Sequence, residues 1–133
     1  MQESFKTLQE AREFFKHDLF ATGAGVKIVS VNDKACVCEM EIENRHKNAG
    51  GNTMGGAIFT LADATFGGLA NYLHLPTVAQ SASANFLKAT QKGILTATAS
   101  LIKNGRSTTI VDVLITDQDN NKIAKITITG FKL

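Results

Sequence analysis

The sequence predicts an α+β fold, in which one antiparallel sheet of five or six strands wraps around a long buried helix. The helix is predicted over residues 55–74, which carry one acid and are apolar on nearly every helical face. Such a helix is expected to be buried. The sheet is predicted from four consecutive runs rich in β-branched residues, at 78–89, 94–103, 107–116 and 122–131. Because no helix separates these runs, they do not fit the alternating pattern of a parallel α/β protein.

Short turns join the last three of these runs, and strands joined in this way pair antiparallel. Asn104-Gly105 predicts a tight hairpin. Residues 117–121 are Asp, Gln and Asn, of which Asp and Asn favour turns. The free edge and face of such a sheet are expected to meet a partner subunit.

An N-terminal helix is predicted over residues 4–20, where apolar residues recur at helical spacing. It is expected to begin at the capping box Thr7-Leu8-Gln9-Glu10, or earlier at Ser4, and to end at Gly23 and Gly25. The capping side chains satisfy backbone N–H groups that the first turn leaves without partners.

Two strands are predicted between the helices, at residues 26–31 and 34–43. The second strand alternates, with Cys36, Cys38, Met40 and Ile42 on one face. In an extended chain, residues two apart are separated by roughly 6.5–7 Å, which is at or past the limit for a disulfide. No histidine has zinc-site spacing to these cysteines, so we expect two small buried hydrophobic side chains and no metal.

The 133 residues are predicted to form one domain, 1–133, with a substantial core. A net charge of +2 with scattered basic residues argues against a nucleic-acid-binding protein. The first eight residues lack the apolar stretch of a secretory signal, and the longest uncharged stretch is too polar and glycine-rich to span a membrane. We therefore expect a cytoplasmic protein with no membrane partner.

Asp63 is the one formally charged residue between Lys47 and Lys88. A carboxylate on a buried helix is costly unless it is paired or its pKa rises, and such groups are common at functional sites. Asp63 is therefore the first candidate for catalysis. The alternative is a buried structural carboxylate held by hydrogen bonds.

Gly55-Gly56 opens the same helix, where free N–H groups and the positive end of the helix dipole could stabilise an oxyanion. Asn48, on the preceding loop, could donate to a carbonyl or orient a water. Each also has a structural alternative: a tight turn for the glycines, and a turn-forming amide for Asn48. Eight residues separate Gly55 from Asp63, or roughly 12 Å along a helix. If both act on one carbonyl, they must come from two subunits.

The stretch His46-x-Asn48-x-x-Gly51-x-x-Met54-Gly55-Gly56, followed by Leu61-Ala62-Asp63, resembles the signature of the hotdog-fold acyl-CoA thioesterases. It is closest to the phenylacetate-pathway (PaaI-like) group, and the element order matches from about Phe15 to Phe131. Residues 81–88 resemble the strand that follows the helix in that family.

The resemblance implies a hotdog fold and hydrolysis of a coenzyme A thioester with an aryl or medium-chain acyl group. It gives Gly55 N–H the role of oxyanion donor, Asn48 a supporting role, and Asp63 that of general base or nucleophile. It also implies substrate contacts from Met54, Gly56, Ser81 and Ser83. Family members form dimers, commonly paired into tetramers, and need no metal or redox cofactor.

One position departs from the family pattern, because Met54 stands where the family usually has His. Methionine is a poor hydrogen-bond donor, so a non-catalytic acyl-CoA or fatty-acyl binding protein is an alternative. A dehydratase of the same fold is a third, although neither His46 nor His74 has an obvious partner motif. Basic side chains at strand ends are candidates to bind the coenzyme A phosphates, unless they are ordinary solvated residues: Lys88, Lys92, Lys103 and Arg106.

Overall fold

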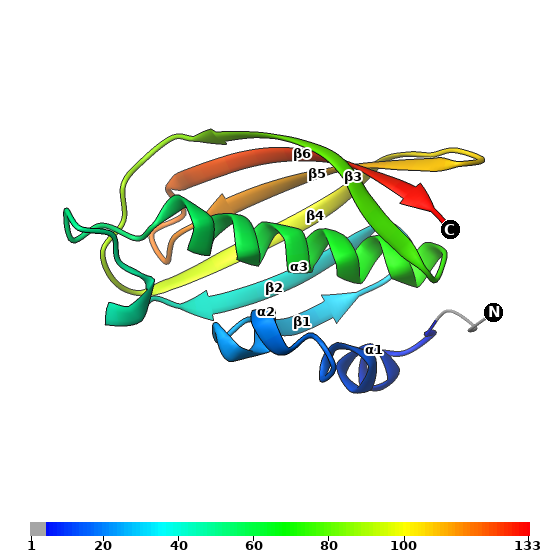
Figure 1. Ribbon diagram of the computed structural model, residues 1–133, viewed down its shortest axis with the longest axis horizontal. Coiled ribbons are helices and arrows are strands. Elements are labelled where there is room, and N and C mark those ends of the chain that lie inside the picture. The colour runs from blue at the N-terminus through cyan, green and yellow to red at the C-terminus, as the bar shows by residue number, and fades with distance from the viewer. Residues whose placement is uncertain (1–4) are drawn as a thin grey trace.

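A six-stranded antiparallel sheet curves around the helix α3, Gly55–Leu73 (Figure 1). This computed structural model describes residues 5–133. The strands follow the order β1-β2-β4-β5-β6-β3 and have these bounds: β1 Lys27–Val31, β2 Ala35–Glu41, β3 Thr77–Phe86, β4 Ile94–Asn104, β5 Thr108–Thr116 and β6 Lys122–Lys132. The predicted α+β class, the sheet and the central helix are confirmed. Within residues 5–133, no helix is both long and apolar enough to cross a membrane.

The core lies between the concave face of the sheet and one face of α3. Alternate residues along β5 are buried, as expected for a strand with one face covered. The helix contributes Leu61, Phe66 and Leu69 to this core. The expectation that α3 is buried on nearly every side is wrong for the single chain. The sheet covers one face, whereas Gly56 and Asp63 on the opposite face are exposed.

The N-terminal helix is two helices, α1 Leu8–Phe15 and α2 Leu19–Gly23, which corrects the prediction of one helix over 4–20. The chain breaks because the Asp18 carboxylate accepts from Ala21 N–H at 3.0 Å and so starts a new helix. Thr7 caps α1 by accepting from Glu10 N–H at 3.1 Å. In the predicted capping box the Glu10 carboxylate would accept from Thr7 N–H. It accepts instead from Lys6 N–H, one residue earlier. Ser4 lies outside the described residues.

The β4–β5 hairpin is present, but its tip is Arg106-Ser107 and not the predicted Asn104-Gly105. Gly105 N–H donates to the Thr108 carbonyl at 2.8 Å, which closes a two-residue loop. Asn104 stays in the ladder opposite Thr109, whose hydroxyl donates to the Asn104 side chain at 3.0 Å. The predicted turn at 117–121 is confirmed, since the Asp117 carboxylate accepts from the N–H groups of Asp119 and Asn121.

Strand β3 lies at the edge of the sheet and, among residues 5–133, pairs only with β6. Its residues from Val78 to Phe86 are all exposed in the single chain. This edge could accept a further strand.

Cys36 and Cys38 are both free thiols in the core, with 0% and 2% of their surface exposed. A hydrogen bond to the Cys38 thiol, together with burial, raises the pKa of Cys36. A side chain at Gly68 would place its Cβ 2.6 Å from the Cys36 sulfur, so this close approach of α3 to β2 requires glycine.

Candidate active site

The loop before α3 is held by backbone hydrogen bonds and a buried histidine. Met54 N–H donates to the His46 carbonyl at 2.8 Å, and Thr53 N–H donates to the Thr90 carbonyl at 2.9 Å. His46 Nδ1 accepts from Glu43 N–H at 2.9 Å, so Nε2 carries the proton and donates to the Ala24 carbonyl at 2.7 Å. Both ring nitrogens are therefore engaged, and His46 fixes the loop against the end of α2.

The first turn of α3 presents N–H groups that its own hydrogen bonds do not use. Ala57 and Ile58 N–H both donate to the Met54 carbonyl, so the N–H groups of Gly55 and Gly56 have no partner within the helix. The Phe86 ring lies over Gly55, where an added Cβ would sit 3.4 Å from it. Sequence reasoning missed Phe86. An aromatic residue ending the strand after the helix was the signal.

Asn48 is an exposed residue whose side-chain oxygen accepts from Gly50 N–H at 3.0 Å and Asn52 N–H at 3.2 Å. The turn-forming interpretation is therefore correct for its oxygen. The Nδ2 group is the part of this side chain left to donate to a carbonyl or a water. Its role beside Gly55 stays a prediction.

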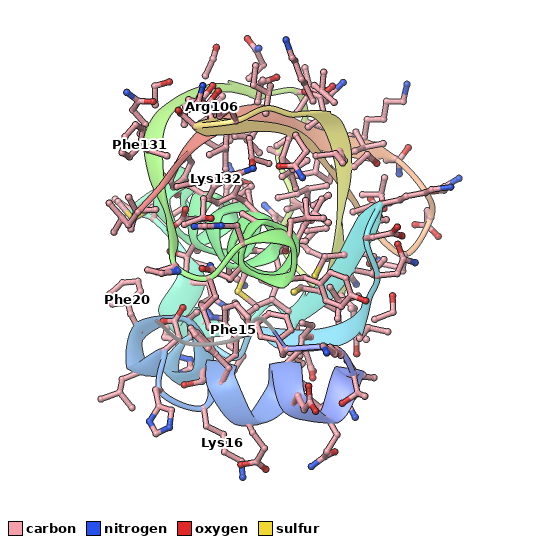
Figure 2. The ribbon with its side chains drawn as sticks, turned by 90° about the vertical axis from the view of Figure 1, so that its right-hand side faces the viewer. Phe15, Lys16, Phe20, Arg106, Phe131 and Lys132 are labelled. Carbon is pink, nitrogen blue, oxygen red and sulfur yellow. The ribbon has the colours of Figure 1, made fainter. Side chains whose placement is uncertain are left out.

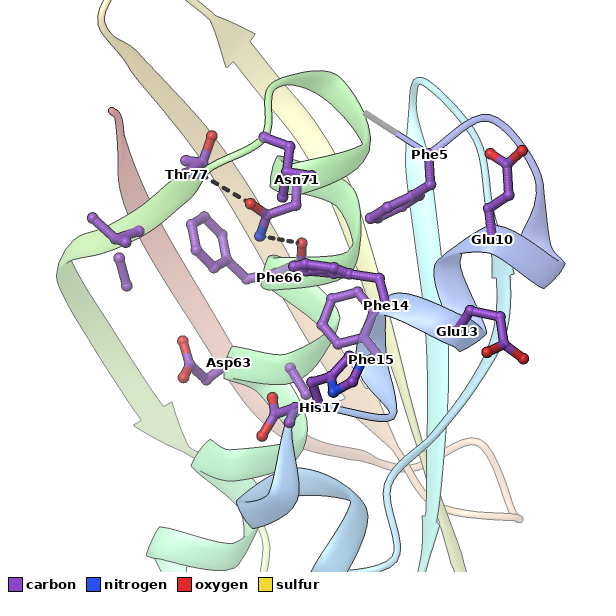
Figure 3. A pocket seen from close by; sticks show the side chains of 16 residues that line it. Phe5, Glu10, Glu13, Phe14, Phe15, His17, Asp63, Phe66, Asn71 and Thr77 are labelled. Atoms are coloured by element: carbon purple, nitrogen blue, oxygen red, sulfur yellow. Dashed lines mark hydrogen bonds between the residues drawn. The ribbon is translucent and has the colours of Figure 1, made fainter. Parts of the chain in front are cut away.

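Asp63 lies on α3 two turns after Gly55. It forms part of the wall of an open groove of about 1120 Å³ between α3, α1 and the start of β3 (Figure 3). The prediction that its carboxylate is buried is wrong for the single chain, since its face of α3 is uncovered. Nearby protein still displaces part of its water. This desolvation, and then the negative charge of Asp18, raise the pKa of Asp63.

Gly55 and Asp63 are not brought together within one chain. Both belong to the same continuous helix, so their α-carbons are separated by roughly 12 Å along its axis. Met54, whose surface is 55% exposed, and Gly56 line a different hollow of about 550 Å³ beside Phe20 and Arg45.

Ser81 and Ser83 lie on the outer face of the sheet. They pair with Thr129 and Thr127, whereas the alternate positions of β3 pair with the buried residues Ile126 and Ile128. Within one chain they therefore face away from α3. The substrate contact predicted for them stays a prediction.

The basic candidates separate to opposite ends of the sheet. Lys88 and Lys92 flank Thr90, beside the start of α3. Arg106 and Lys103 lie at the β4–β5 hairpin, where Arg106 is near Lys132 (Figure 2). Lys88 bonds to Ile123 at one end of β6, and Lys132 bonds to Ser107 of the hairpin at the other end. Ile123 and Lys132 are nine residues apart, or roughly 30 Å in a strand, so Lys88 and Arg106 of one chain cannot bind the same phosphate. No group of three or more His, Cys, Asp or Glu within residues 5–133 could hold a metal ion.

Comparisons with known proteins identify the family. The family model described as "Thioesterase superfamily" matches residues 50–124, which include Gly55, Asp63 and β3. This chain belongs to the thioesterase superfamily. The thioesterase is 30% identical over 122 residues to "Acyl-coenzyme A thioesterase PaaI" of Escherichia coli (strain K12), covering 91% of this chain and 87% of that protein.

Solved structures agree. The E. coli PaaI protein from the phenylacetic acid degradation operon superposes with a TM-score of 0.89 at 28% identity, covering 94% of this chain and 91% of that one. A hypothetical thioesterase from Streptococcus pneumoniae TIGR4, solved with coenzyme A, gives 0.82 at 32% identity, covering 88% and 94%. The predicted PaaI-like family, hotdog fold and thioester hydrolase class are thus confirmed for this thioesterase.

Proposed function

We propose that this thioesterase hydrolyses acyl-coenzyme A thioesters with an aryl or medium-chain acyl group, releasing the free acid and coenzyme A. One observation carries the proposal. The open face of α3 presents unused N–H groups at Gly55-Gly56 and, two turns on, the Asp63 carboxylate with a raised pKa. The names of the E. coli and S. pneumoniae relatives, an acyl-coenzyme A thioesterase and a protein solved with coenzyme A, support it.

In the general-base route, the Asp63 carboxylate takes a proton from water while the water oxygen attacks the thioester carbonyl carbon. The Gly55 N–H, assisted by Asn48, stabilises the oxyanion. The tetrahedral intermediate then collapses, the C–S bond breaks, and the coenzyme A thiolate takes up the proton. In the nucleophilic route, Asp63 attacks the carbonyl itself, coenzyme A leaves, and water hydrolyses the resulting anhydride.

The site requires two chains, because one helix cannot bring Gly55 and Asp63 to one carbonyl. We propose a homodimer in which each α3 supplies the donor end to one site and the carboxylate to the other, with two dimers forming a tetramer. The exposed edge of β3 and the exposed side chains of Leu19 and Phe20 support a partner surface. We propose the cytoplasm as the compartment.

The proposal is tested by incubating the purified protein with acetyl-, hexanoyl-, benzoyl- and phenylacetyl-CoA and measuring release of the coenzyme A thiol. We expect turnover that is faster for the aryl and medium-chain substrates than for acetyl-CoA. Binding of these compounds in calorimetry without thiol release would instead support the non-catalytic binding protein, which Met54 favours. The dehydratase alternative is weakened because both ring nitrogens of His46 are already engaged.

Replacing Met54 with histidine is expected to raise kcat/KM or to broaden the range of acyl groups. The imidazole would add a hydrogen-bond donor beside the thioester oxygen, and the exposed position of Met54 leaves room for it. The same substrate panel measures the effect, with Met54→Leu as the control that changes shape without adding a donor. Unchanged or lower kcat/KM for every substrate would show that the family histidine is not needed here.

Replacing Asp18 with asparagine is expected to shift the acid limb of the pH–kcat/KM profile to lower pH. Asp63 acts as a carboxylate, so activity falls as the pH drops through its pKa. Asp18 raises that pKa by its negative charge, so removing the charge lowers it. Asparagine also keeps the cap on α2.

Glu13→Gln is the matched control for that experiment. Glu13 lines the same groove, but the negative charge that raises the pKa of Asp63 is that of Asp18, so Glu13→Gln should leave the acid limb in place. A profile that does not move in Asp18→Asn would show that Asp63 is not the group that titrates.

A further inference from the structure

The groove that holds Asp63 is lined by aromatic rings from two helices (Figure 3). Phe14 and Phe15 come from α1 and Phe66 from α3. The Phe14 and Phe15 ring centroids lie 5.2 Å apart, and both rings contact Phe5, with centroid distances of 5.7 Å in a tilted arrangement and 6.1 Å edge-on. Phe15 also rests on α3 where Gly67 has no side chain, since a Cβ there would lie 3.7 Å from its ring. The aromatic wall is therefore fixed one helical turn from Asp63.

The position of Asp63 fixes where a substrate must react. Because its carboxylate lies in the wall of this groove, the thioester carbonyl must enter the groove to be attacked. The groove, at about 1120 Å³, has space for an aryl or medium-chain group, since small-molecule sites typically occupy about 300–1,000 Å³.

The charges in the groove beside Asp63 and in the hollow beside Met54 and Gly56 indicate which end of the substrate each of them binds. Four carboxylates line the groove: Glu10, Glu13, Asp18 and Asp63. His17 also lines it, and its described lining residues include no Lys or Arg. The hollow beside Met54 and Gly56 contains Arg45, which pairs with Glu43 at 2.9 Å, and its described lining residues include no Asp or Glu. Coenzyme A carries several phosphate charges, which like charges repel and arginine attracts. The coenzyme portion is therefore excluded from the groove beside Asp63.

We infer that the groove between α1 and the Asp63 face of α3 receives the acyl group, and that its carboxylates select acyl groups without a negative charge. This inference rests on the proposed function. It makes α1 a determinant of specificity, with Phe14 as an aromatic contact and Glu13 as the carboxylate least involved in folding. Glu10 and Asp18 accept hydrogen bonds from backbone N–H groups at the starts of helices. Glu13 is exposed and, among residues 5–133, forms an ion pair only with Lys16.

The charge selection is tested with hexanoyl-CoA and adipyl-CoA, which have six-carbon acyl groups and differ by a terminal carboxylate. We expect the wild type to prefer hexanoyl-CoA. Glu13→Lys should raise the adipyl-to-hexanoyl ratio of kcat/KM by roughly two- to fivefold, and added salt should reduce the effect. Asp119→Asn, which changes an exposed charge at the β5–β6 turn, outside the residues that line the groove, should leave the ratio unchanged.

The aromatic wall is tested with phenylacetyl-CoA and acetyl-CoA. Phe14→Ala should lower the phenylacetyl-to-acetyl ratio of kcat/KM by roughly three- to tenfold, the worth of an aromatic contact. Phe14→Leu keeps most of the packing, so it should fold and still lower the ratio. Phe131→Ala removes an exposed ring that is not among the residues that line the groove and should not change it.

The outcomes separate the inference from the function on which it rests. A wild type that hydrolyses none of these acyl-CoAs contradicts both. A wild type that hydrolyses them, with both ratios unchanged in Glu13→Lys and Phe14→Leu, contradicts the inference alone. A wild type that prefers adipyl-CoA to hexanoyl-CoA also overturns it.

Discussion

Asp63→Asn is expected to lower kcat by roughly 10²–10⁴-fold, the range for loss of an acid–base group. Asparagine has the same shape but can neither take a proton from water nor attack a thioester. The side chain lies on the open face of α3, so the substitution removes no core packing and the fold should remain intact. The measurement is steady-state hydrolysis of the best substrate in the acyl-CoA panel.

The control for this prediction is Asp119→Asn, which makes the same chemical change at an exposed turn outside the groove that holds Asp63 and should retain full activity. Circular dichroism and the thermal midpoint should match the wild type for both variants. A correctly folded Asp63→Asn protein with near-wild-type kcat would remove Asp63 from the mechanism. If the nucleophilic route operates and water attacks the aspartyl carbonyl of the anhydride, single-turnover hydrolysis in ¹⁸O-water should place ¹⁸O in the Asp63 carboxylate of the wild type.

Mixing two inactive variants is expected to restore activity if each site is shared between subunits. Each chain supplies the donor end to one site and the carboxylate to the other site. Asn48→Ala damages the donor end that its chain supplies, and Asp63→Ala removes the carboxylate that its chain supplies. After the two proteins are unfolded together and refolded, about half of randomly paired dimers contain one chain of each kind. Each mixed dimer has one doubly damaged site and one intact site. Activity should therefore return to about a quarter of the wild-type value.

Refolding each variant alone gives the baseline, and native mass spectrometry measures how many mixed dimers form. If each site were built within one chain, every site in the mixture would still carry one lesion. Activity no higher than the mean of the two parents, in a sample with proven exchange, would exclude the shared site. Because Asn48 is exposed and its oxygen holds the turn, Asn48→Asp provides a second donor-end variant that keeps this acceptor.

The parts of the fold that the sequence predicts well are those decided by local pattern. The central helix and the five longest strands end within three residues of their predicted bounds, because alternation and apolar runs persist over whole elements. The 117–121 turn follows from Asp and Asn side chains that bond to nearby backbone groups. The hairpin tip was misplaced because Asn104 bonds across the ladder to Thr109, and such a pair depends on register.

The site is harder to predict because its parts lie on different elements. The isolation of Asp63 correctly marked a carboxylate with a raised pKa, but its burial was overestimated. An apolar pattern indicates that a helix face is covered, but it does not say whether the covering residues belong to the same chain. Asp18, which helps raise that pKa, belongs to a helix break that the amphipathic pattern of residues 4–20 conceals. Phe86 contacts Gly55 only because β3 returns along the helix.

Chemical labelling of the two core thiols can report when the core of the protein opens. Cys36 and Cys38 are the two cysteines of the chain, and the folded molecule exposes almost none of either. An alkylating reagent therefore modifies the chain only in molecules whose β2 and α3 have separated. The labelling rate at increasing denaturant then measures the free energy of that separation. Because the folded enzyme shields both thiols, they do not add to the signal of an assay that measures the thiol released from coenzyme A.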